Sequence, residues 1–263
     1  MLKKLLKYDL EYIFKFLIIF YSLGLFFALF TRIFLSIDNS LACYVIGKIC
    51  SGTTISMIFS IFINNLMRLW VRFKTHFYSD EAYLTHTLPI SKTVHYLSKI
   101  VTAVISVFTS VSVIGLSLFI AYYSKGNINL LKSIILPIAN AYESNITTIL
   151  VSFFLVLFVE FAVILQSGFT GTILGHRMNS MKTGFSVLFG FITYICTQIF
   201  ALMVIFIISL FNEGVMNLFI TNSIVDINVI KTVVYLSIAI YSIIFFTLCF
   251  INIKLFKKGV NVD

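Results

Sequence analysis

The chain has 263 residues, of which 60% are apolar and only 11% are charged, and its mean hydropathy is +1.04. Soluble globular domains average about 45–50% apolar and about 25% charged residues. This composition therefore excludes a soluble protein and, because apolar residues dominate, a disordered one. In so apolar a chain, the net charge of +9 indicates lysine and arginine gathered on one side of a membrane. We expect an integral membrane protein that does not bind nucleic acid.

Six stretches of the sequence are long and apolar enough to cross a bilayer, which takes about 20 helical residues. They are 16–34, 44–70, 100–123, 146–170, 184–211 and 232–253. No internal repeat, long linker or soluble domain interrupts them. We therefore predict an all-α polytopic integral membrane protein, a single transmembrane domain over residues 1–263 with six transmembrane helices.

The basic residues predict how these helices are oriented. Of the 19 lysines and arginines, 14 lie in the N-terminal arm, in the loops after the second and fourth stretches, or in the C-terminal tail. The other five lie at or near the opposite ends of the stretches. Because short cytoplasmic segments are enriched in lysine and arginine, both the N and C termini should be cytoplasmic.

Three segments outside the apolar stretches have local structure of their own. Residues 1–15 alternate leucines with charges, which predicts an amphipathic interfacial helix in the headgroup layer; the alternative is a cytoplasmic extension of the first span. The connections 124–145 and 212–231 contain apolar runs too short to span a bilayer. These runs could form short helices on the outer face or enter the bilayer partially.

Residues 72–99 form the longest predicted cytoplasmic loop, and their sequence predicts a short helix bounded at both ends. Ser79 is a favourable N-cap, and the acidic pair after it falls where the helix dipole favours anions. About two helical turns over 82–87 should end before Pro89, and Ser91 can cap the following helix. Such a helix could transmit force from a soluble partner; the alternative is an ordinary connecting loop.

The stretch 79–92 reads Ser-Asp-Glu-Ala-Tyr-Leu-Thr-His-Thr-Leu-Pro-Ile-Ser-Lys. It resembles the corresponding loop of ABC-2 type transporter permeases, in the variant of low-GC Gram-positive bacteria. Leu-Leu-Lys-Tyr-Asp-Leu at 5–10 resembles the opening segment of those permeases, and the six-span layout with both ends inside is similar over the whole chain. One departure is Ala82, where many relatives carry glycine.

The resemblance implies that this loop is a coupling helix, which docks into a cleft of a separate ATP-binding subunit. The docking residues implied in this way are Asp80, Glu81, Tyr83, Leu84, His86, Thr87, Leu88 and Pro89. No G-x-x-x-x-G-K-[ST] phosphate loop occurs in the sequence, and the pair Gly47-Lys48 lies within a predicted span. If ATP drives the protein, the nucleotide and its Mg²⁺ should therefore bind to the partner subunit, and this chain is not itself an enzyme.

The resemblance also implies the assembly, the location and the direction of transport. Two permease subunits, as a homodimer or a heterodimer, would form the pathway in a bacterial cytoplasmic membrane above two ATP-binding subunits. The implied function is export of an amphipathic substrate such as a peptide, an antimicrobial or a lipid-like compound.

Glu160 is the one acidic residue deep in a predicted span, where an unpaired charge costs about 2.5–3.5 kcal/mol on insertion scales. Ser167 and Gly171 share its helical direction, so this face should meet protein or a cavity. The functional interpretation is a pathway residue that contacts a cationic or amphipathic substrate. The structural alternative is a neutral carboxyl hydrogen-bonded to Gln198 or to a hydroxyl group on another span.

The remaining polar residues favour structural roles. Hydroxyl and amide side chains in the second and third spans are typical of helix–helix contacts in lipid; they are Thr53, Ser56, Ser60, Asn64, Thr102, Ser106, Thr109, Ser110 and Ser117. The four histidines and four cysteines have no metal-binding spacing, and no nucleophile–base motif occurs. We therefore expect no metal, cofactor or catalytic site in this chain.

Two other classes of function remain open from the sequence. An ATP-independent secondary carrier or channel would use Glu160 as its coupling residue. A non-transporting membrane anchor or sensor would use the 72–99 loop to hold a cytoplasmic ATPase.

Overall fold

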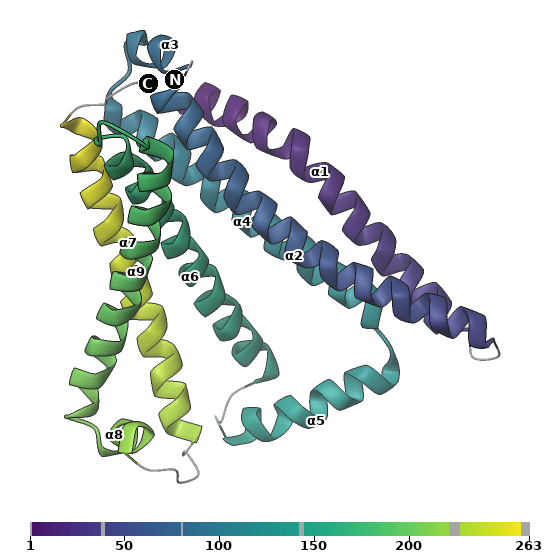
Figure 1. Ribbon diagram of the computed structural model, residues 1–263. Helices are drawn as coiled ribbons and strands as arrows, with labels where there is room; N and C mark the ends of the chain where they lie inside the picture. The colour runs from purple at the N-terminus through teal and green to yellow at the C-terminus, as the bar shows by residue number, and fades with distance from the viewer. Residues whose placement is uncertain (1, 38–39, 80, 142–144, 221–226, 259–263) are drawn as a thin grey trace. The chain divides into compact units, whose positions relative to one another are not determined.

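The computed structural model describes residues 2–37, 40–79, 81–141, 145–220 and 227–258, and all regular secondary structure within these ranges is α-helical (Figure 1). The helices are α1 (Leu2–Leu35), α2 (Leu41–Tyr78), α3 (Ala82–Thr87), α4 (Lys92–Tyr122), α5 (Lys125–Ala141), α6 (Ile146–Gly175), α7 (Lys182–Ser209), α8 (Glu213–Ile220) and α9 (Ile227–Lys257).

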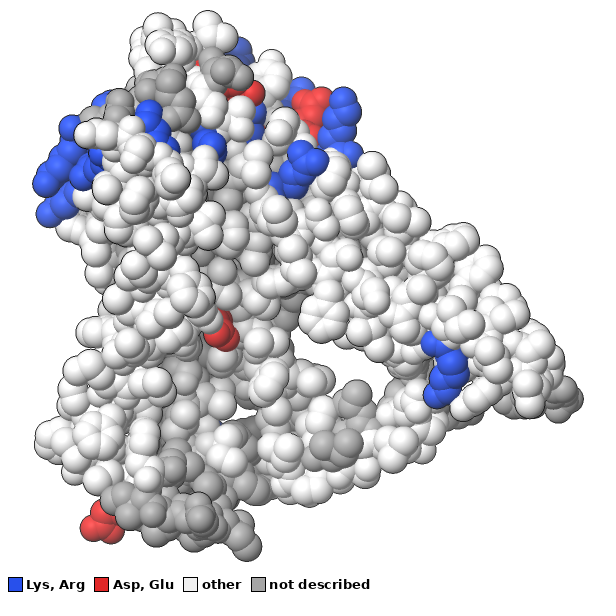
Figure 2. Space-filling view, in the orientation of Figure 1, with Lys and Arg blue, Asp and Glu red and all other residues white. Residues whose placement is uncertain are grey.

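Six of these helices, α1, α2, α4, α6, α7 and α9, are long and apolar enough to cross a membrane. The predicted all-α fold with six candidate spans is thus confirmed, and the chain is a multi-pass membrane protein. In the space-filling view of Figure 2, most of the visible surface belongs to uncharged residues. Which side of the membrane each terminus faces stays a prediction from the charges.

The N-terminal segment is continuous with the first span. Helix α1 has 34 residues and is therefore about 50 Å long at 1.5 Å per residue, against a hydrocarbon core of about 30 Å. Its buried side recurs every three or four residues, as expected of a helix packed along one face. The buried residues are Asp9, Ile13, Leu17, Tyr21, Gly24, Ala28 and Thr31. The alternative interpretation of residues 1–15, an extension of the first span, has the geometry of such an unbroken helix. Whether these residues lie in the headgroup layer stays a prediction.

The helices form two compact units, each described here by itself. Unit one comprises residues 1–76 and 83–130, and unit two comprises 77–82 and 131–263. In unit one, α1 packs along α4. The Tyr21 hydroxyl and Ser110 Oγ are 2.6 Å apart and hydrogen-bonded, and Asn65 Nδ2 of α2 donates to the same Ser110 Oγ at 2.7 Å. One serine thus joins three helices, in the way that polar side chains join helices in lipid.

The polar residues by which α2 contacts other helices lie one position further along the chain than predicted. Thr53, Ser56 and Asn64 hydrogen-bond to carbonyl groups of their own helix. Their neighbours Thr54 and Asn65 are buried and reach other helices, because these positions lie on the packed side of α2. On α4 the prediction is right for Ser106 and Ser110, which bond to Asn65.

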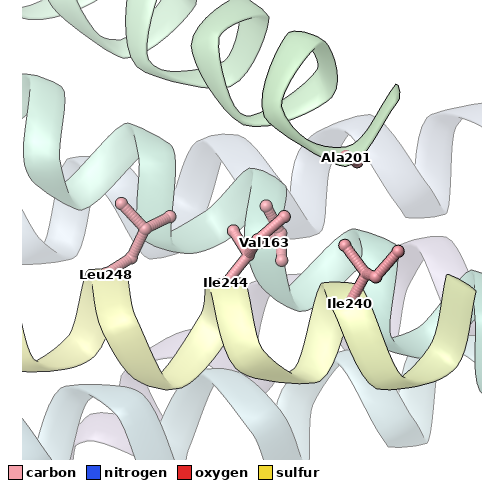
Figure 3. Packing of buried hydrophobic residues seen from close by; sticks show 5 residues of the cluster. All are labelled: Val163, Ala201, Ile240, Ile244 and Leu248. Carbon is pink, nitrogen blue, oxygen red and sulfur yellow. The ribbon is translucent and has the colours of Figure 1, made fainter. Parts of the chain in front are cut away.

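In unit two, α6 packs against both α7 and α9. The centre of this three-helix packing is a cluster of buried aliphatic side chains, one from α6, one from α7 and three from α9 (Figure 3). They are Val163, Ala201, Ile240, Ile244 and Leu248. A buried polar network lies nearer the C-terminal end of α9, where Asn252 Nδ2 donates to Gln166 Oε1 at 3.1 Å and Asn252 Oδ1 accepts from Thr170 Oγ1 at 2.8 Å.

Helices α6 and α7 approach closely at glycines. A Cβ atom added at Gly171 would meet the backbone of Ser186 and Gly190, and one added at Gly175 would meet Ser186. Gly171 and Gly175 are four residues apart, which is the spacing of small residues that lets membrane helices pack backbone to backbone. The small face predicted from Ser167 and Gly171 is the side of α6 that packs against protein, with Ser167 only 1% exposed.

Helices α5 and α8 occupy the two connections whose apolar runs were predicted to form short helices or to enter the bilayer. Their helical structure is confirmed. Residues 142–144 and 221–226 of these connections lie outside the described residues.

Candidate functional site

Helix α3 is the short bounded helix that the sequence predicts, with the predicted extent. The loop around it is shorter than predicted, because α2 continues to Tyr78. The cause is packing: Phe73, Phe77 and Tyr78 at the end of α2 are 2% exposed or less. The burial of these aromatic side chains stabilises the helix beyond the end of the apolar stretch.

The two serines flanking α3 accept backbone hydrogen bonds. The Ala82 N–H donates to the Ser79 carbonyl at 2.8 Å, and capping by the Ser79 side chain stays a prediction. Ser91 occupies the N-cap position of α4, as predicted, but its carbonyl rather than its hydroxyl accepts the first N–H groups of that helix.

The side chains of α3 divide into a buried and an exposed set. Ala82 is fully buried and Thr85 is 3% exposed, whereas Tyr83 is 67% and Leu84 is 74% exposed. Of the other predicted docking residues, His86, Thr87, Leu88 and Pro89 are exposed and Glu81 is half-buried. Asp80 lies outside the described residues. The two buried residues, Ala82 and Thr85, are also the two positions of 80–89 that the resemblance does not include in the docking set.

Both chain segments that flank α3 are firmly packed. Before it, the Phe77 ring lies 4.7 Å from the Phe256 ring, and the Tyr78 ring lies 4.3 Å from the His176 ring, all within unit two. After it, Tyr96 is fully buried within unit one. A short helix with exposed apolar side chains therefore lies, along the chain, between two segments whose aromatic side chains are buried.

Unit one also contains a buried ionic cluster, which is centred on Asp9 of α1. Lys99 Nζ lies 2.6 Å and Arg72 Nε lies 3.1 Å from Asp9 Oδ1, and the Asp9 side chain is only 3% exposed. Ser98 Oγ donates to Asp9 Oδ2 at 3.4 Å. The cluster joins the N-terminal part of α1, the C-terminal part of α2 and the start of α4, so these three helix ends lie together.

The sequence interpretation missed this cluster. It counted Arg72 and Lys99 only as orientation signals and gave Asp9 no role beyond the opening segment. On the helix Asp9 shares a face with Leu5, Leu6 and Ile13, which is a detectable signal for a buried acid. The partner could not be found, because Lys99 is 90 residues away in the chain.

Glu160 lies near the middle of α6 and is half-buried. Its Oε1 accepts a hydrogen bond from the Tyr194 hydroxyl of α7 at 3.5 Å, which is at the long limit for such a bond. Gln198 does not serve as its partner: Gln198 Oε1 instead accepts from the Tyr241 hydroxyl of α9 at 2.7 Å. Ser167 Oγ bonds to the Val163 carbonyl of its own helix.

These four residues form a polar cluster, Glu160–Tyr194–Gln198–Tyr241, beside the aliphatic centre of unit two. Glu160 and Gln198 each lie three residues before a core residue of their helix, Val163 and Ala201, and Tyr241 packs against that core. Residues three apart share a helix face, so the cluster continues the packed side of all three helices. The sequence predicted Glu160 and Gln198 as intramembrane polar residues but missed both tyrosines, because tyrosine is common throughout this chain.

No protein-family model, curated protein or solved structure matches this chain.

Proposed function

We propose that this chain is the permease subunit of an ATP-driven exporter, and that α3 with its flanking residues docks on a separate ATP-binding subunit. The observation that carries the proposal is the exposure of Tyr83, Leu84 and Leu88 (67%, 74% and 44%), which lie on α3 or directly after it and outside the apolar stretches. Apolar side chains exposed together, and not facing lipid, are typical of a protein interaction site. The resemblance of residues 79–92 to ABC-2 permeases supports an ATP-binding subunit as the partner.

The position of α3 in the chain also suits force transmission. The boundary between the two compact units falls within α3, after Ala82. A displacement of α3 would therefore pull on a packed segment of each unit, through Phe77 and Tyr78 on one side and Tyr96 on the other. An ordinary connecting loop with mobile flanks would absorb the displacement instead.

Co-purification tests this proposal. The chain is expressed together with a phosphate-loop ATPase of the same organism, and the amount of ATPase retained on an affinity tag is measured. We expect Glu81→Lys with Leu88→Asp to lower retention about tenfold or more, because truncating a central interface contact costs about 2 kcal/mol or more. A photoreactive residue at Leu84 should cross-link the ATPase.

The matched control is Leu130→Asp, which places the same charge on an apolar side chain that is 63% exposed on α5. This variant should retain the ATPase at the wild-type level. Equal retention by the double variant and the wild type would contradict docking at α3.

The two alternative functions give different results. A secondary carrier that uses Glu160 would transport in vesicles without ATP and would retain no ATPase. An anchor or sensor would retain the ATPase through α3, but ATP hydrolysis would not depend on a transported substrate.

A further inference from the structure

Glu160 has no cationic side chain among the apolar stretches of unit two. These three stretches, 146–170, 184–211 and 232–253, contain no lysine, arginine or histidine. In the described part of the chain, its carboxylate accepts one long hydrogen bond, from Tyr194. An ionised carboxylate at membrane depth is costly unless it is paired or faces water, so a cation that reaches Glu160 from outside these helices would be stabilised there.

The same protein shows how it neutralises a carboxylate that stays in place. Asp9 is almost fully buried and has two cationic partners, Lys99 and Arg72, at 2.6 and 3.1 Å. Glu160 is instead half-buried and therefore reachable from outside the packed helices. Asp9 thus belongs to a structural ion pair, whereas Glu160 is left accessible on one side.

The neighbours of Glu160 favour an organic cation over a metal ion. Tyr194 and Tyr241 bring hydroxyl groups to the cluster: Tyr194 donates to Glu160, and Tyr241 fixes Gln198 by a 2.7 Å hydrogen bond. Ca²⁺ would require about six to eight oxygen ligands and Mg²⁺ about six in octahedral geometry, which one carboxylate does not provide.

We propose that Glu160, Tyr194, Gln198 and Tyr241 form a binding site for the cationic group of an amphipathic organic substrate. The inference rests on the proposed transport function and narrows its substrate class to organic cations. The carboxylate provides the charge, Tyr194 positions it, and Gln198 with Tyr241 forms the polar wall on α7 and α9.

Binding to the purified chain tests the site without any ATPase. Tetraphenylphosphonium and tetraphenylborate have the same shape and opposite charge, and neither titrates. Equilibrium dialysis in lipid nanodiscs, with the binding to empty nanodiscs subtracted, should show that wild-type protein binds the phosphonium at least about tenfold more tightly than the borate, because only the cation is attracted by the Glu160 carboxylate.

Variants assign the binding to this cluster. Glu160→Gln should weaken phosphonium binding about tenfold, whereas Glu160→Asp, which keeps the charge, should retain the preference for the cation. The matched control is Glu213→Gln, at an exposed acid that begins α8, and it should bind like the wild type. Size-exclusion chromatography of each variant checks that it remains folded.

Two results would overturn the proposal: equal binding of the two ions by the wild-type protein, or phosphonium binding that is unchanged in Glu160→Gln. The wild-type comparison keeps the test decisive even if that variant fails to fold. Because no ATPase is present, a negative result here leaves the co-purification test of α3 unaffected, and loss of ATPase docking leaves the binding result intact.

Discussion

The two carboxylates Asp9 and Glu160 show how the surroundings of a residue decide its role. Asp9 has a lysine and an arginine within hydrogen-bonding distance and is closed off from solvent. Burying such a group costs several kcal/mol, which a well-formed cluster offsets only if both signs of charge remain in place. Removing one member should therefore cost far more than an exposed charge contributes.

Asp9→Asn leads to a first prediction at the residue scale. The substitution keeps the shape of the side chain but removes the carboxylate that Lys99, which is 4% exposed, contacts at 2.6 Å. Breaking a buried ion pair in this way costs about 3–5 kcal/mol. We expect a lower midpoint of thermal unfolding in detergent, followed by labelling of the newly accessible cysteines.

The control is Glu11→Gln, an exposed acid two residues further along α1, which should unfold at the wild-type temperature. Adding Lys99→Met to Asp9→Asn should recover part of the lost stability, because the buried lysine charge is then removed together with the carboxylate that it contacts. If Asp9→Asn and Glu11→Gln unfold at the same temperature, Asp9 does not hold the three helix ends together.

At the scale of the element, α6 and α7 form a pair whose contact depends on the absence of side chains. Gly171 and Gly175 of α6 let its backbone approach Ser186 and Gly190 of α7. Lipid tails are as apolar as apolar side chains, so the hydrophobic effect does not drive membrane helices together. Their association depends instead on close van der Waals packing of this kind. The glycines thus stabilise this pair, although glycine disfavours a helix in isolation.

Gly171→Ala and Gly115→Ala should consequently change stability in opposite directions. A methyl group at Gly171 would meet backbone atoms of α7, and overpacking of this kind costs about 1–3 kcal/mol. Gly115 of α4 has no atom within 4 Å of an added Cβ, so alanine there should stabilise by about 0.5 kcal/mol through helix propensity. Thermal unfolding of the two variants in the same detergent measures both effects, and a loss of stability at Gly115 equal to that at Gly171 would contradict the close approach.

The elements could be predicted from the sequence where the signal is local. The apolar stretches gave six spans, and Pro89 with the residues before it gave the extent of α3, because span length and proline geometry act within a few residues. The end of α2 at Tyr78 could not be predicted, since it depends on buried contacts such as that between Phe77 and Phe256. The choice between Asn64 and Asn65 has the same cause: adjacent residues point in different directions, and only the packed helices show which one is inside.

At the scale of the whole molecule, charge is distributed toward particular helix ends within each unit. In unit one, Asp9, Arg72 and Lys99 bring together the start of α1, the end of α2 and the start of α4. In unit two, Arg177 Nη2 donates to the Leu255 carbonyl at 2.6 Å, which places the turn after α6 beside the end of α9. These helix ends carry the lysines and arginines that predict the cytoplasmic side. Within each unit, the ends that lie together are the ones that alternating spans would place on that same side.

Cysteine labelling of intact cells tests the predicted orientation. The native cysteines, Cys43, Cys50, Cys196 and Cys249, are all free thiols and are first replaced by alanine. Single cysteines are then introduced at Tyr83 and at Leu130, which are 67% and 63% exposed, so that accessibility within the fold is matched. A membrane-impermeant maleimide should label Leu130→Cys in intact cells and label Tyr83→Cys only after permeabilisation, because the positive-inside rule places the α3 segment in the cytoplasm. Labelling of Tyr83→Cys from outside would reverse the orientation and remove α3 from the reach of any cytoplasmic ATPase.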